Sequence, residues 1–306
     1  MRGWLQDLGD LVLPAECGGC GRPRTTLCAR CGDALCAGAP RRVRPTPEPP
    51  GLPVVHAAAP YQDAVRAVLL AHKERGVLGL AEPLGAALAG AVRAGLGETE
   101  DGGGGGGGGP VDRRTRAGGV RTPESGRTQA GVRTQPGART QPTPPPPPPT
   151  PLLLIPVPSA RKAVRARGHD PSRRIAYAAA AELRRVGVPA RVCAALRQRR
   201  VVADQAGLNS RRRLANLAGA LEVPAGARAL LAAGGRIVLV DDVMTTGASL
   251  AEAARAIRAA VAGTAEDESD GITPRWVGTA RELPARNSIS AAVVAASPSS
   301  FEINRN

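Results

Sequence analysis

One short segment, residues 237–249, constrains the fold of this chain more than any other part of its sequence. Four apolar residues, Ile237 to Val240, lead directly into Asp241 and Asp242. An apolar run of this kind predicts a strand that is buried on both faces and carries two carboxylates at its open end. Adjacent carboxylates can accept hydrogen bonds from a vicinal diol, such as that of a ribose, or hold Mg²⁺ through water. The segment therefore favours a site for ribose or magnesium.

The residues that follow indicate a turn that opens a helix; they are Thr245, Thr246, Gly247, Ala248 and Ser249. The first N–H groups of a helix lack intrahelical partners and carry the positive end of its dipole, so they attract anions. Gly247 would allow close approach, and the hydroxyl groups would add donors. The nucleotide-binding P-loop is excluded because no Gly-Lys-Ser/Thr sequence follows. The alternative is an ordinary strand that ends at an Asp cap before a helix.

A basic segment follows a second predicted strand at 152–157. It consists of Ser159, Ala160, Arg161 and Lys162, with Arg165 and Arg167 shortly after them. Hydrogen bonds from arginine to phosphate are strong and directional, so this segment suits a pyrophosphate group. A solvated basic face is the alternative, because runs of exposed arginine are common.

Strand and helix patterns alternate through most of the chain. Helices are predicted at 61–71 and 80–96, from Pro171 with Asp170 as N-cap, and after Gly247. Strands are predicted at 152–157, within 188–196, at 236–240 and at 291–296. This alternation implies an α/β fold with a doubly wound, mostly parallel sheet. Such sheets bind ligands beyond the carboxyl ends of their strands.

Composition separates other segments from this core. Residues 97–150 contain runs of eight glycines and six prolines, which predict a disordered low-complexity insertion. Residues 264–290 are polar and aperiodic, and are predicted to be a disordered loop. A last strand and tail would occupy 291–306. The polar, Arg-rich stretch 197–220 fits either a mobile lid over the ligand or a solvated loop.

Four cysteines near the N-terminus form two Cys-x-x-Cys-Gly motifs: Cys17, Cys20, Cys28 and Cys31. Each following glycine, Gly21 and Gly32, would let backbone N–H groups turn toward a thiolate. The spacing predicts a structural four-cysteine zinc site within residues 1–40, although iron–sulfur and disulfide alternatives remain. Cys36 and Cys193 are interpreted as small apolar residues. The three histidines form no spaced cluster, and only His169 lies near a predicted ligand loop.

Charge indicates the chemistry of the partner. The chain carries a formal net charge of +15, and residues 151–263 hold 19 Arg and Lys against 7 Asp and Glu. An excess of this size favours a phosphate-bearing ligand. Proteins that bind single-stranded nucleic acid usually add aromatic platforms for the bases, and this chain has only five aromatic residues. A small pyrophosphorylated ligand is therefore favoured over a nucleic acid.

The N-terminal residues 1–14 are apolar at intervals, but Asp7 and Asp10 interrupt them, which predicts a short amphipathic helix rather than a signal peptide. No stretch reaches the roughly 18 uninterrupted apolar residues of a membrane span. Glu16 before Cys17 does not suit a lipoprotein cleavage site. We therefore expect no membrane span and a cytoplasmic protein.

The segment from Val238 to Ser249 resembles the signature of the type I phosphoribosyltransferases: apolar residues, two acidic residues, then Thr-x-Gly-x-Ser/Thr. This resemblance implies that Asp241 and Asp242 contact the ribose hydroxyls of phosphoribosyl pyrophosphate with Mg²⁺, and that residues 245–249 bind its 5-phosphate. Purine-salvage members carry an Asp immediately before the Thr-Gly pair, where this chain has Thr245. Purine salvage is therefore disfavoured.

Together with the cysteine motifs, further segments resemble the ComF/GntX family. They are Tyr-x-Asp-x-Val-Arg-x-x-Leu-x-x-x-Lys-x-x-Gly at 61–76, Pro-Val-Pro at 156–158, Arg-x-Arg-Gly-His at 165–169, Asp-Gln-x-x-Leu at 204–208, and Arg-x-x-x-Asn at 212–216. The resemblance implies a phosphoribosyltransferase-like domain over 53–96 and 151–263, and a cytoplasmic factor associated with DNA uptake and use. It leaves the acceptor open. The alternative is a non-catalytic, ligand-sensing adaptor that contacts a competence helicase or single-stranded DNA.

Overall fold

The computed structural model describes residues 16–101, 151–200, 210–232, 235–267 and 289–304. Its main strands are β1 (Arg41–Val43), β2 (Val55–Pro60), β3 (Leu152–Pro156), β4 (Ala190–Val192), β7 (Ile237–Met244) and β8 (Ile289–Ala296). They form a six-stranded sheet in the order β1-β2-β8-β7-β3-β4. β1 is antiparallel to β2, and every other neighbouring pair is parallel. The prediction of an α/β fold with a mostly parallel sheet is confirmed.

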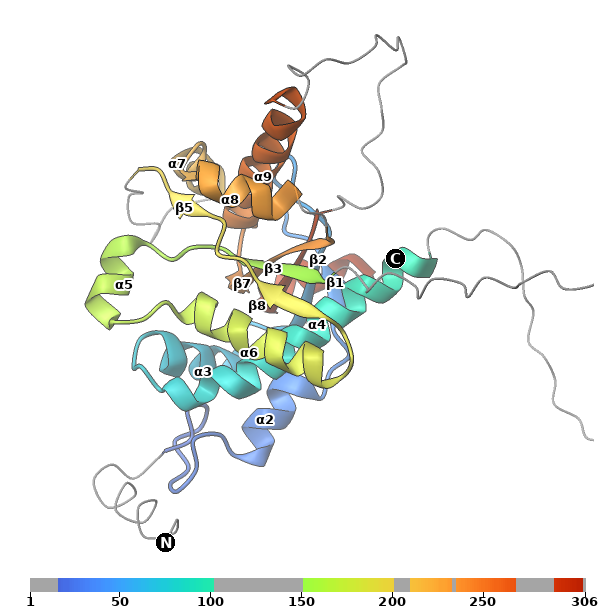
Figure 1. The fold of residues 1–306 in the computed structure, drawn as a ribbon. Coiled ribbons are helices and arrows are strands. Elements are labelled where there is room, and N and C mark those ends of the chain that lie inside the picture. The colour runs from blue at the N-terminus through green and yellow to red at the C-terminus, as the bar shows by residue number, and fades with distance from the viewer. Residues whose placement is uncertain (1–15, 102–150, 201–209, 233–234, 268–288, 305–306) are drawn as a thin grey trace, which may run out of the picture.

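The helices are α2 (Ala29–Cys36), α3 (Asp63–Lys73), α4 (Ala81–Asp101), α5 (Arg161–Arg167), α6 (Pro171–Arg185), α7 (Ser210–Leu217), α8 (Ala225–Ala232) and α9 (Ala248–Asp267). Two short 3-10 helices lie at Leu78–Leu80 and Pro298–Asn304. Helices α2, α3, α4 and α6 lie on one side of the sheet, and α7, α8 and α9 lie on the other (Figure 1). The sheet is therefore the middle layer of three.

The alternation of side chains along the central strand β7 explains why both faces are covered. Val238 and Val240 pack in the apolar cluster formed with α4 and α6. Ile237 and Leu239 point the other way and pack in the cluster formed with α9. All four are buried, so neither face could be left in water without a large loss of hydrophobic stabilisation.

The close packing of α4 against α6 depends on Gly85. A Cβ atom at this position would overlap the side chain and backbone of Ala178 on α6, so only glycine allows the two helices to approach so closely. At the start of α6, Asp170 accepts a hydrogen bond from the backbone N–H of Arg173, and Pro171 occupies the first turn. The predicted cap of this helix is confirmed.

The path of the chain reverses across the sheet at β3. From β3 the chain passes through α5 and α6 to β4 on one side, and later returns to β7 on the other side of β3. The helices after β3 and β7 therefore cover opposite faces. In open α/β sheets this arrangement leaves a crevice at the carboxyl ends of the two strands, and ligands bind there.

The Arg-rich stretch folds into a small element that we call the hood: β5 (Arg197–Gln198), α7 and β6 (Leu221–Glu222). β5 and β6 pair antiparallel. The backbone N–H of Leu221 donates to Glu252 Oε1 on α9 at 3.0 Å, and Arg255 Nη2 donates to the Leu221 carbonyl at 3.0 Å. The residues of the stretch 197–220 that the structure describes therefore belong to a folded element that contacts α9, and not to the solvated loop that was one alternative. Residues 201–209 lie outside the described part of the chain.

Several predicted boundaries also need correction. β7 continues to Met244, so both aspartates lie within the strand and not beyond it. α4 continues through Asp101 and α9 through Asp267, so the insertion predicted from 97 and the loop predicted from 264 begin with helical residues. The predicted N-terminal helix, residues 102–150 and residues 268–288 lie outside the described part of the chain. Among the described helices, none has the length and apolar character of a membrane span.

We expect Glu252→Ala to destabilise the fold by about 1–3 kcal/mol, because Glu252 is only 4% exposed and its loss leaves the buried Leu221 N–H without a partner. Burial raises the pKa of the Glu252 carboxyl, but Arg255 and the Leu221 N–H outweigh this and hold the pKa below its ordinary value. The contribution is therefore present at neutral pH and lost as the pH falls through that lowered pKa. Urea unfolding of wild type and variant at pH 7 measures this difference in stability. The control Glu182→Ala removes an exposed ion pair with Arg185, and equal losses in the two variants would contradict the prediction.

Candidate functional site

A cavity of about 320 Å³ opens at the carboxyl ends of β3 and β7, under the hood. Its wall combines residues from all three segments that the sequence singles out. These are Asp241 and Asp242 from β7, Ser249 from α9, Ser159 and Ala160 from the loop after β3, and Arg167 from α5. Further residues also line the cavity. Lys73 and Ser172 contribute polar groups, and Gln198, Leu217 and Leu221 come from the hood. The structure thus brings predicted site residues from distant parts of the chain into one cavity.

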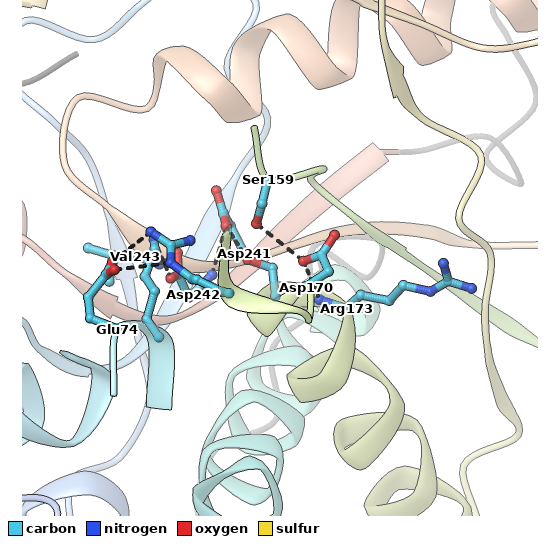
Figure 2. Close-up of polar contacts among 10 residues, drawn as sticks. Glu74, Ser159, Asp170, Arg173, Asp241, Asp242 and Val243 are labelled. Atoms are coloured by element: carbon cyan, nitrogen blue, oxygen red, sulfur yellow. Dashed lines mark hydrogen bonds and ion pairs between the residues drawn. The ribbon is translucent and has the colours of Figure 1, made fainter. Parts of the chain in front are cut away.

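The two carboxylates at the cavity are held by different partners (Figure 2). Asp241 Oδ1 accepts from Ser172 Oγ at 3.2 Å and from the Asp242 backbone N–H at 2.8 Å. Asp242 Oδ1 accepts from the Val243 N–H at 2.8 Å, and its Oδ2 pairs with Lys73 Nζ at 2.7 Å. Both oxygens of Asp242 are thus engaged within the protein, whereas both of these hydrogen bonds to Asp241 reach its Oδ1; the two residues line the cavity together.

A shift in side-chain alternation places both aspartates near the cavity. Val240 packs in the cluster on the α4 and α6 side, and strict alternation would put Met244 on that side as well. Instead Val243 packs there, and Met244 packs on the α9 side. The shift by one residue falls across Asp241 and Asp242. Two consecutive side chains of one strand can therefore line the same cavity.

The electrostatics of the aspartate pair favour a cationic or hydrogen-donating ligand. Burial, followed by the neighbouring charge of Asp242, raises the pKa of the Asp241 carboxyl well above its ordinary value. For Lys73, burial lowers the pKa, but the attraction of Asp242 outweighs burial and leaves it raised. A cation or the hydroxyl groups of a ligand at Asp241 would stabilise its charged form.

The turn between β7 and α9, with the start of α9, contains the residues 245–249 that the sequence predicts to bind a phosphate. Gly247 adopts φ +71°, which favours glycine, and precedes the helix. A Cβ atom at Gly247 would lie 3.1 Å from the Leu52 side chain, so the group that approaches this glycine closely is a side chain of the protein itself. Thr245 Oγ1 accepts from Arg213 Nη1 of the hood at 3.0 Å, and Ser249 lines the cavity. Thr245, Thr246, Gly247 and Ala248 do not line it.

The predicted basic segment divides between two cavities because it is helical. In α5, Ala160, Ala163 and Arg167 follow one another at helical spacing and line the first cavity. Arg161, Val164 and Arg165 occupy another face and line a neighbouring cavity of about 300 Å³, which shares Pro158, Ser159 and Gln198 with the first. Lys162 is exposed and lines neither. Of the three predicted arginines, only Arg167 reaches the aspartate cavity.

Sequence reasoning did not assign Lys73 or Ser172 to the site. Lys73 is the lysine of the motif at 61–76. That motif is the only sequence signal for Lys73, because its partner Asp242 lies 169 residues further along the chain. Ser172 lies in the first turn of α6 and carries no motif signal. His169, which lies near a predicted ligand loop, packs edge-on against His72 with ring centroids 5.9 Å apart, and its Nδ1 donates to the Arg167 carbonyl at 3.1 Å. His169 does not line the cavity.

The sulfur atoms of Cys17, Cys20, Cys28 and Cys31 all lie within 4.8 Å of one another. The two Cys-x-x-Cys-Gly motifs do not fold into two matching turns. Gly21 has φ +74° and its N–H donates to the Cys17 carbonyl at 2.8 Å, whereas Cys28 is the N-cap of α2, and both Cys31 and Gly32 lie in the helix. The turning role predicted for Gly32 is therefore wrong. A Cβ atom at Gly19 would lie 2.6 Å from Cys31 Sγ, so this glycine leaves space for the sulfur cluster.

The cysteine cluster suits a structural metal such as zinc. Tetrahedral zinc–sulfur bonds of about 2.3 Å place the sulfurs about 3.8 Å apart, close to the 3.6 Å between Cys20 and Cys28. Burial raises the pKa of the Cys17 thiol, but N–H groups of Cys28, Cys20 and Gly19 donate to it and lower the pKa to about 6. Burial and the neighbouring sulfurs raise the pKa of Cys31 to about 12. A dication would compensate four thiolates held this closely.

Comparison with protein-family models and with curated proteins finds no match to this chain. The evidence for its function therefore comes from its own residues and their geometry.

We expect the purified protein to contain about one zinc ion per chain, because the four cysteine sulfurs lie within 4.8 Å of one another and four thiolates suit a closed structural zinc site. Cys20→Ser removes an exposed member of the cluster and should lose most of the zinc without disturbing the core. Cys36→Ser, at an exposed cysteine outside the cluster, is the matched control and should retain it. Mass spectrometry of the metal content of the two variants tests this prediction. Equal zinc in the two variants, or the visible absorption of an iron–sulfur cluster, would contradict the prediction.

Proposed function

We propose that the cavity between β3 and β7 binds phosphoribosyl pyrophosphate, or a closely related phosphorylated ribose, in the manner of the type I phosphoribosyltransferases. The observation that carries this proposal is the convergence in one cavity of Asp241 and Asp242, of Ser249 from the helix-opening turn, and of Arg167 from the basic segment. Because the cavity lies where the chain reverses across the sheet, it also occupies the position where such folds bind ligands.

Each wall of the cavity has a proposed partner on the ligand. Asp241 would accept hydrogen bonds from the ribose hydroxyls and share Mg²⁺ with the ligand, while Asp242 stays held by Lys73. The 5-phosphate would bind beside Ser249, the residue of the turn at 245–249 that lines the cavity, near the start of α9. Arg167, with Ser159 and Ala160, would bind the pyrophosphate. Arg161 and Arg165 would act from the neighbouring cavity.

A ligand bound in this way can undergo displacement of pyrophosphate at C1 of the ribose by a base or amine. Arg167 and Lys73 are the cavity's cationic side chains and would stabilise charge on the leaving group, and Mg²⁺ would supply further charge neutralisation. The hood covers the cavity through Gln198, Leu217 and Leu221, which limits access of water that would compete with the acceptor. The reaction proposed is pentosyl transfer to an acceptor of unknown structure.

The resemblance of the cysteine and arginine motifs to the ComF/GntX family extends the proposal to a role associated with DNA uptake. In that role the protein would be either a transferase or an adaptor that senses the ligand and contacts a competence helicase or single-stranded DNA. Both versions share the ligand-binding cavity. They differ in whether an acceptor triggers release of pyrophosphate.

We expect phosphoribosyl pyrophosphate with Mg²⁺ to raise the melting temperature. At one hundred times Kd the stabilisation is about 2.7 kcal/mol, which corresponds to a shift of roughly 5–10 °C for a protein of this size. Asp241→Asn should remove most of the shift, because it removes the charge at the ribose wall while the Lys73 pair remains. Glu182→Gln makes the same chemical change at a surface ion pair and should keep the full shift. No shift in the wild-type protein at millimolar ligand would refute the proposed cavity ligand.

Release of pyrophosphate then separates the enzyme from the adaptor. If the protein is a transferase, pooled bases and amines should release pyrophosphate from phosphoribosyl pyrophosphate, and Asp241→Asn should abolish the release. A ligand-dependent rise in melting temperature without release supports the adaptor. Direct binding of single-stranded DNA at another surface would instead weaken steeply with salt and survive Asp241→Asn.

A further inference from the structure

The arginine that the proposed function assigns to pyrophosphate already has an anionic partner. Glu74 accepts from one edge of the Arg167 guanidinium, with Oε1 2.8 Å from Nη2 and Oε2 3.0 Å from Nε. Arginine uses this bidentate geometry for carboxylates and for phosphates alike. Arg167 lines the aspartate cavity, whereas Glu74 does not. Glu74 therefore occupies, from outside, the Nε–Nη2 edge of Arg167, one of the two edges through which this arginine could bind a phosphate of a ligand in the cavity.

Glu74 is held in this place by its two neighbours. On one side, Lys73 pairs with the buried Asp242 at 2.7 Å. On the other, Arg75 Nη2 donates to the carbonyl of Gly18 at 3.1 Å, within the first cysteine motif. The end of α3 is thus tied to the sheet and to the cysteine cluster. The contact of Glu74 with Arg167 is a consequence of the fold and not a chance encounter of two mobile side chains.

The ion pair is also weak enough to be exchanged. The Glu74 side chain is 48% exposed and that of Arg167 is 20% exposed. Solvent screens a pair of this kind, so its net contribution is small compared with that of a buried pair. A pyrophosphate group carries more charge than a carboxylate and offers several acceptor oxygens, so it can displace Glu74. A ligand without an anionic group at Arg167 cannot.

From this geometry, and resting on the proposed function, we propose that Glu74 is a specificity-determining residue that competes with the ligand for Arg167. A ligand gains the Nε–Nη2 edge of Arg167 only if it carries a pyrophosphate that displaces Glu74. Phosphoribosyl pyrophosphate meets this condition. Ribose 5-phosphate, which has one phosphate at the opposite end of the sugar, does not. The competition therefore bears on the pyrophosphate end of the ligand and leaves the phosphate turn unaffected.

The test compares the dissociation constants of these two ligands, measured by isothermal titration calorimetry with Mg²⁺, for wild type, Glu74→Gln, Arg167→Gln and the double variant. We expect Glu74→Gln to bind phosphoribosyl pyrophosphate about three- to fivefold more tightly, since it loses a competitor whose pairing is that of a surface ion pair. Arg167→Gln should bind it about tenfold more weakly or worse. Ribose 5-phosphate should bind all four proteins equally.

The double variant separates competition from a general change of charge. If Glu74 acts through this edge of Arg167, Glu74→Gln has no effect once Arg167 is replaced, and the double variant matches Arg167→Gln. A general electrostatic effect would instead strengthen both ligands in both backgrounds and would overturn the proposal. Melting temperatures without ligand show whether each variant is folded, and Glu74→Ala provides a second variant that cannot bond to Arg167.

The result also distinguishes this inference from the proposed function. If neither ligand binds the wild-type protein at millimolar concentration, the proposed function fails. If both bind and Asp241→Asn weakens them, but Glu74→Gln leaves their affinity ratio unchanged, only the role of Glu74 is refuted.

Discussion

The ion pair between Lys73 and Asp242 is the interaction on which the candidate site depends. Asp242 is 4% exposed, and a buried carboxylate without a partner would be strongly destabilising. The partner comes from α3, so the end of this helix must lie against the end of β7. The helix then brings with it the cysteine cluster, through Arg75 and Gly18. One buried charge thereby links the sheet, the cavity and the N-terminal module.

A second buried carboxylate has a similar organising role on the opposite face of the sheet. Glu252 on α9 bonds the backbone of Leu221, and Arg255 completes the contact. The hood has few apolar residues of its own, so it cannot be held by hydrophobic burial alone. The two carboxylates thus place polar segments with the precision that a binding cavity needs, because directional hydrogen bonds define position better than apolar contacts do.

The parts of the fold that could be predicted from sequence are those with local signals. β3, β7 and β8 contain continuous apolar runs, and α6 begins with an Asp-Pro cap. Each of these elements can therefore be recognised from a few neighbouring residues. β2 could not be recognised in this way, because Val-His-Ala-Ala-Ala-Pro is a strand only by virtue of its pairing with β8. The same holds for Lys73, whose role exists only once α3 and β7 meet. Long-range contacts carry no local pattern.

The basic segment after β3 shows that the same cations are arranged differently in a loop and in a helix. Four cations within seven residues suggest a single anion site if the segment is a loop, in which side chains can converge. In α5 successive residues are rotated by about 100°, so cations four apart share a face while those two apart diverge. Arg161 and Arg165 therefore face the neighbouring cavity, and Arg167 alone faces the aspartates. Among the described residues that line the aspartate cavity, Arg167 is the one arginine, and Glu74 pairs with it. The helical period of α5 thus explains why the role proposed for Glu74 concerns Arg167 and not Arg161 or Arg165.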